Sequence, residues 1–90
     1  MKIKILGKTY NLKFVNYLGQ HNGDCSNPNE THKTIRITKG LAGKEKLDTL
    51  IHEFIHAAGW YIDEKFVEQF ATDVAKILYD LGYINEDEMK

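Results

Sequence analysis

Apolar and polar residues alternate along the first fourteen positions of the chain. Residues 2–5 read KIKI and residues 9–14 read TYNLKF, so every second side chain is apolar in both stretches. A period of two is typical of a β-strand with one buried face. The pair Gly7-Lys8 separates the two stretches with a glycine at the turn. This pattern predicts a β-hairpin with a two-residue connection.

The next segment is polar and then returns to alternation. Residues 16–32 are rich in Gly, Asn, Asp and Ser and contain the single proline, which predicts a loop, with a short strand around residues 18–20. Residues 33–38, KTIRIT, alternate again and end before Gly40. We expect a further strand there.

The second half of the chain has helical periodicity. Apolar residues recur every three or four positions along residues 47–58 and again along residues 67–81. Asp63 is a suitable N-cap for the second helix, and Gly59 and Gly82 follow the two periodic stretches. Only about three residues, 60–62, remain for the connection, and so short a loop predicts antiparallel neighbouring helices.

Together these elements predict one small α+β domain spanning residues 1–90. A small antiparallel or mixed sheet occupies residues 1–40, an antiparallel helical hairpin residues 41–82, and an acidic tail, expected to fray, residues 83–90. Ninety residues support a single core with a small stability margin, to which a bound metal ion would add.

Composition narrows the class of function. The formal net charge of −1 gives no basic field for nucleic acid or for an anionic membrane surface. No apolar run approaches the length of a membrane span, and the single cysteine cannot form an intrachain disulfide. We therefore expect a cytoplasmic protein that binds neither nucleic acid nor membrane, while the oligomeric state has no signature in the sequence.

The stretch His52-Glu53-Phe54-Ile55-His56 is an HExxH motif inside the first predicted helix. Positions i and i+4 lie about 40° apart around a helix, so both imidazoles can bind one zinc ion at about 2.0–2.1 Å. Glu53 points to the side of that pair, where it can accept a proton from a water on the metal. Shuffled chains give HExxH in about one case in a hundred. However, Glu53 is the only Asp, Glu, Lys or Arg between Thr49 and Ile62, and a charge in so apolar a turn is costly unless it is paired or binds metal.

A catalytic zinc site needs a third protein ligand, and two carboxylates on the second helix are candidates. Glu64 and Glu68 are one turn apart on the same rim of the apolar face, so periodicity does not choose between them. Glu64 falls in the first helical turn, where the helix dipole already stabilises its charge. Glu68 lies a full turn inside the helix, and we predict Glu68 as the ligand.

These features resemble the gluzincin metallopeptidases, in particular the minigluzincins and the short HExxH proteins of phages, which are related to the ImmA/IrrE and SprT-like groups. The similar stretches are residues 22–38, 47–60 (LDTLIHEFIHAAGW) and 63–75 (DEKFVEQFATDVA), about half of the chain. The resemblance implies zinc ligation by His52, His56 and Glu68 and catalysis by Glu53. It also implies a strand beside the cleft, containing Ile35 and Ile37, to which a peptide substrate adds in extended form.

Five further residues could belong to a site, and for each the plainer interpretation has more support. A loop cysteine can cap a metal as a thiolate, but a lone cysteine is more often inert. Loop histidines can donate to an oxyanion but are usually solvated. Aromatic residues after the first helix fit closure of the hairpin better than a substrate subsite. These residues are Cys25, His21, His32, Trp60 and Tyr61.

The sequence thus predicts a zinc metallopeptidase that hydrolyses peptide bonds with metal-activated water and Glu53 as general base. Its partner is a peptide or protein substrate. The main alternative is a non-catalytic zinc-stabilised binding or regulatory module, for example a phage regulator. A third interpretation is a small DNA-associated protein that uses zinc structurally. A structural zinc site needs four ligands and no neighbouring base, and the presence of Glu53 therefore favours the enzyme.

Overall fold

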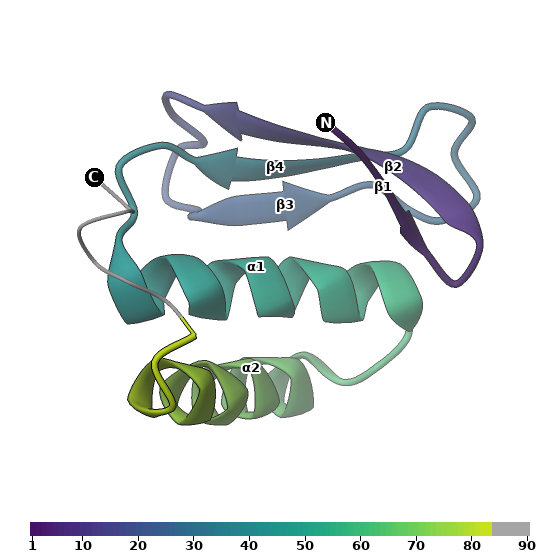
Figure 1. The fold of residues 1–90 in the computed structure, drawn as a ribbon. Coiled ribbons are helices and arrows are strands. Elements are labelled where there is room, and N and C mark those ends of the chain that lie inside the picture. Colours follow the sequence, from purple (N-terminus) through teal and green to yellow (C-terminus); the bar gives the residue numbers. More distant parts are fainter. Residues whose placement is uncertain (84–90) are drawn as a thin grey trace.

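The protein is a three-layer α+β unit in which a four-stranded sheet, one helix and a second helix are stacked in that order (Figure 1). The computed structural model describes residues 1–83; residues 84–90, which make up most of the predicted tail, lie outside the described residues. The elements are β1 (Lys2–Ile5), β2 (Lys8–Val15), β3 (Gly23–Cys25), β4 (Thr34–Thr38), α1 (Gly43–Ala58) and α2 (Glu64–Asp80). The predicted order of a sheet followed by a helical hairpin is confirmed.

The sheet is mixed, with the strand order β1-β2-β4-β3. β2 and β4 run parallel, while β1 pairs with β2 and β3 pairs with β4 in the antiparallel direction. The hairpin turn is formed by Leu6 and Gly7, with φ of 50° and 78°, one residue earlier than predicted. The strand expected at residues 18–20 is also wrong, because the loop instead supplies β3 at Gly23–Cys25.

The central position of β4 corrects one prediction about the site. Ile35 and Ile37 were expected on a strand that a substrate could pair with, but β4 is hydrogen-bonded on both sides, to β2 and to β3. Both side chains are completely buried between the sheet and α1. Alternation showed correctly that one face of this strand is apolar, but it carries no information about which strand lies at the edge.

Besides three buried residues of α2, the core consists of one cluster between the sheet and α1. Its fully or almost fully buried members come from β2, β4 and α1, and Leu50 and Phe54 of α1 pack against them. The buried set is Tyr10, Leu12, Ile35, Ile37 and Ala57. Because Tyr10 is wholly buried, its hydroxyl needs a partner, and it donates to the carbonyl oxygen of Ala57 at 3.4 Å. This bond ties the sheet to the last turn of α1.

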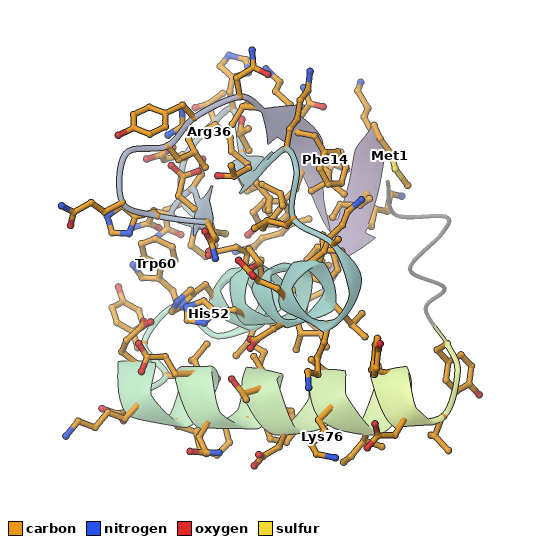
Figure 2. All side chains as sticks on the ribbon, turned by 90° about the vertical axis from the view of Figure 1, so that its left-hand side faces the viewer. Met1, Phe14, Arg36, His52, Trp60 and Lys76 are labelled. Atoms are coloured by element: carbon orange, nitrogen blue, oxygen red, sulfur yellow. The ribbon has the colours of Figure 1, made fainter. Side chains whose placement is uncertain are left out.

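α2 lies on the side of α1 away from the sheet and returns along it. α1 is seen along its length in Figure 1 and nearly end-on in Figure 2, whereas Figure 2 shows α2 along its length, so the helices cross obliquely. Asp63 is the N-cap, as predicted, and its carboxylate accepts from the Phe66 backbone N–H at 3.2 Å. Thr72 of α2 donates to Asp48 of α1 at 2.8 Å, which links the middle of α2 to the first half of α1. Neither helix of the described part has the length and apolar character needed to cross a membrane.

Candidate metal centre

The HExxH residues lie on α1, as predicted, on the side of the helix that faces β3 and the start of α2. In Figure 2, His52 and Trp60 lie on the same flank of the molecule, between the sheet and α2. The side chains of His52 and His56 are 20% and 18% exposed, so both are largely covered but reachable from solvent. Their Nε2 atoms are 3.0 Å apart, close enough for one small ion to contact both.

Glu64, the first residue of α2, joins the two histidines. One carboxylate oxygen lies 3.0 Å from His52 Nε2 and the other lies 3.1 Å from His56 Nε2. Ligands of a tetrahedral zinc ion with bonds near 2.0–2.2 Å are themselves about 3.3 Å apart. The spacing therefore fits a small metal ion.

His52, His56 and Glu64 form a cluster that could hold a metal ion. No family model, curated protein or solved structure matches this chain. The assignment of a function therefore rests on the motif and on the geometry of the cluster.

Glu68, the predicted third ligand, lines a hollow together with His52, Glu53 and Glu64. It is not one of the three clustered residues. The prediction assumed that the ligand on α2 lies as far from the turn between the helices as His56 was expected to lie on α1. However, His56 is only two residues from the end of α1, and the connection turns back at once, with the Ile62 N–H bonded to the Gly59 carbonyl. The first residue of α2 is therefore already opposite the histidines. Ligation by Glu68 remains a prediction without support from this arrangement.

Glu53 is the charged group most deeply buried beside the cluster, with a side chain only 6% exposed. Burial, together with the nearby carboxylates of Asp24 and Glu64, raises its pKa from an ordinary value of 4.5 to about 7. A carboxyl group with a pKa near neutrality can both accept and return a proton under ordinary conditions. This is the property that a general base in a hydrolase requires.

β3 approaches α1 closely at the site because residue 23 is a glycine. A Cβ placed on Gly23 would lie 3.0 Å from Thr49 Cγ2 and 3.1 Å from Glu53 Cγ. The missing side chain thus lets the strand cover Glu53 and exclude water from it. Gly23 was not predicted as part of the site, because a glycine two residues before the cysteine of a polar loop carries no signal by which it could be found.

His56 and Cys25 differ in how well they suit a metal. Burial lowers the pKa of His56, with opposing effects from Glu64, so the neutral imidazole that binds metals is favoured. Cys25 lines the hollow beside Glu53 and both histidines. Burial, together with Glu53, raises the pKa of its thiol to about 12, and the Sγ donates to the Ser26 carbonyl at 3.3 Å. A protonated thiol is a poor ligand, so this arrangement does not favour an inhibitory thiolate.

Two hollows meet at the cluster. One, of about 350 Å³, extends toward the start of α1 and includes His21, Asp48 and Glu68 in its lining. The other, of about 260 Å³, extends toward the end of α1 and includes Cys25 and Trp60. Of the two loop histidines considered from sequence, His21 lines both hollows and His32 lines neither.

Proposed function

We propose that this protein is a zinc-dependent hydrolase that cleaves peptide bonds. The observation that carries the proposal is the convergence of His52, His56 and Glu64 on one point, next to a buried carboxylate whose pKa is near 7. Three ligands leave a fourth position open, and a neighbouring base has no use in a purely structural zinc site. Glu64 replaces Glu68 as the third ligand in this proposal.

In the proposed hydrolysis, the residues at the cluster have different roles. A zinc ion held by the three ligands would supply a Lewis acid and lower the pKa of a bound water. Glu53 accepts the proton of the attacking water and delivers it to the leaving amine nitrogen. We assign to His21, which lines both hollows, a hydrogen bond to the developing oxyanion.

The edge of the sheet provides a place for the substrate. β3 is at the end of the strand order and pairs only with β4 within the described residues, which leaves its outer edge open. Its first residue, Gly23, packs against Glu53. A peptide that added to β3 in extended form would lie along the two hollows beside the cluster.

The test is hydrolysis of an unfolded protein such as casein by the zinc-loaded wild type and by Glu53→Gln. We expect the variant to keep its zinc and to lose cleavage by at least about a hundredfold, because an amide cannot accept the proton. Glu45→Gln is the matched control, an exposed glutamate two turns earlier on the same helix, and should cleave like the wild type. Equal cleavage by Glu53→Gln would remove Glu53 as the base. Bound zinc without any cleavage would favour the non-catalytic module.

A further inference from the structure

A third hollow lies next to the cluster, at the end of α1. Its volume is about 500 Å³, larger than either hollow that meets at the histidines. Its walls come from the end of α1, the connection to α2, the loop after β3 and the start of β2. The lining consists of Lys8, Asn27, Pro28, Asn29, Ala58, Gly59, Trp60, Tyr61 and Ile62.

The walls of this hollow are mainly apolar. Tyr61 is 90% exposed and Ile62 41% exposed, so both apolar side chains are accessible to a ligand at the hollow. Gly59 keeps Ile62 close to the helix end, since a Cβ at Gly59 would collide with the Ile62 side chain. Lys8 is the one charged residue in the lining, so the hollow offers little to a charged ligand.

Trp60 connects this hollow to the candidate metal centre. It lines both the third hollow and the one that contains His52, Glu53 and His56. The rings of His56 and Trp60 meet edge to face with their centroids 6.4 Å apart. An extended peptide covers that distance with about two residues. A chain cleaved at the cluster would therefore place a side chain near its scissile bond against Trp60.

The opposite side of the cluster has a different character. The hollow toward the start of α1 has Asp48 and Glu68 in its lining as well as Glu53 and Glu64, whereas the lining of the third hollow contains no carboxylate. An apolar side chain of a substrate gains burial at the Trp60 end and none at this acidic end. The two ends therefore distinguish the residues on either side of the bond that is cut.

We propose that the hollow formed by Trp60, Tyr61 and Ile62 is the specificity subsite of the proposed peptidase. Its occupant is an aromatic or long aliphatic side chain of the substrate, one or two residues from the scissile bond. The inference rests on the proposed function for the position of that bond. The binding of an apolar side chain, however, needs only the protein walls and no metal.

Trp60 is the single tryptophan of the chain and reports on the subsite directly. The experiment titrates metal-free wild-type protein with a short blocked peptide of glycine, serine and alanine that carries one central phenylalanine. The control peptide has serine at that position. We expect Trp60 fluorescence to change on binding of the phenylalanine peptide, with an affinity about tenfold higher than for the serine peptide. Equal responses to both peptides, or none, would overturn the proposal.

A variant that fills the hollow provides a second measurement. Ala58 is exposed at the end of α1, and Ala58→Phe adds a ring at the hollow while the other wall residues stay unchanged. The preference for the phenylalanine peptide should then fall from about tenfold to nearly none. Ala42→Phe is the matched control, an exposed alanine at the other end of the same helix, and should keep the full preference. A preference that survives in Ala58→Phe would place the apolar side chain elsewhere.

The outcomes separate the subsite from the peptidase. Selective fluorescence without cleavage by the zinc-loaded protein would retain the subsite and reject the proposed function. Cleavage of casein with no enrichment of apolar residues next to the cut bonds would retain the function and reject the subsite.

Discussion

Replacing Glu53 by glutamine should stabilise the metal-free protein, and the gain should depend on pH. In the folded chain the pKa of Glu53 rises from an ordinary value of 4.5 to about 7, chiefly through burial. Each pKa unit corresponds to about 1.4 kcal/mol of difference between the two protonation states. Folding with an ionised Glu53 therefore costs about 3 kcal/mol, and folding with a protonated Glu53 costs nothing of this kind.

The sign follows from the direction of the shift. Because the pKa of Glu53 is raised in the folded state, the unfolding free energy of the wild type is highest below pH 4.5. It falls as the pH rises from 4.5 through 7. Glutamine resembles the protonated acid and has a similar helix propensity. The Glu53→Gln variant should therefore match the wild type near pH 4 and exceed its unfolding free energy by about 3 kcal/mol near pH 8.

Urea unfolding of both proteins in a chelator, at several pH values between about 4 and 8, measures this difference. For a domain of this size the gain corresponds to a rise in melting temperature of about 10–20 °C at the alkaline end. The exposed Glu45→Gln variant should show no such trend. A gain that is the same at every pH, or a loss at pH 8, would refute the reasoning that Glu53 is held in a water-poor site at a cost to stability.

Three further outcomes test the structure around the site. Gly23→Ala should lower the unfolding free energy by about 1–3 kcal/mol in urea, because the new methyl group meets Thr49, and adding Thr49→Ser should recover part of the loss. Tyr10→Phe should cost about 1 kcal/mol by losing its buried hydrogen bond, whereas Tyr17→Phe, at a side chain 78% exposed, should cost nothing. Asp63→Ala should cost about 1 kcal/mol of stability and should also weaken zinc binding in a calorimetric titration, because the N-cap holds the turn that carries Glu64, the proposed third ligand. Unchanged values would contradict the contact concerned in each case.

The fold class was predictable because the spacing of apolar residues shows which side chains of each element face the core. Alternation identified β1, β2 and β4, and recurrence at three and four residues identified both helices, with Asp63 as the N-cap. The order of the strands was not predictable, since β2 and β4 become parallel neighbours through contacts between distant segments. β3 was missed because its three residues, in a polar loop, are too few to show a period.

The arrangement of the cluster could be predicted where one helix determines it, and could not be predicted where two elements meet. HExxH spacing alone brings His52 and His56 together. The choice between Glu64 and Glu68 depended on how far α2 overlaps α1, which is set by the turn between them and by the oblique crossing. The subsite proposed at Trp60 depends in the same way on a neighbouring loop, residues 27–29, and the local sequence does not show that this loop approaches Trp60.

Zinc titration of the metal-free protein, followed by calorimetry, tests the central claim most directly when it compares wild type, Glu64→Ala and Glu68→Ala. We predict one zinc ion per chain for the wild type and for Glu68→Ala, with similar affinities. Glu64→Ala should bind zinc at least about a hundredfold more weakly, because two histidines alone rarely hold the ion. Failure of the wild type to bind zinc, or loss of binding in Glu68→Ala but not in Glu64→Ala, would contradict the account.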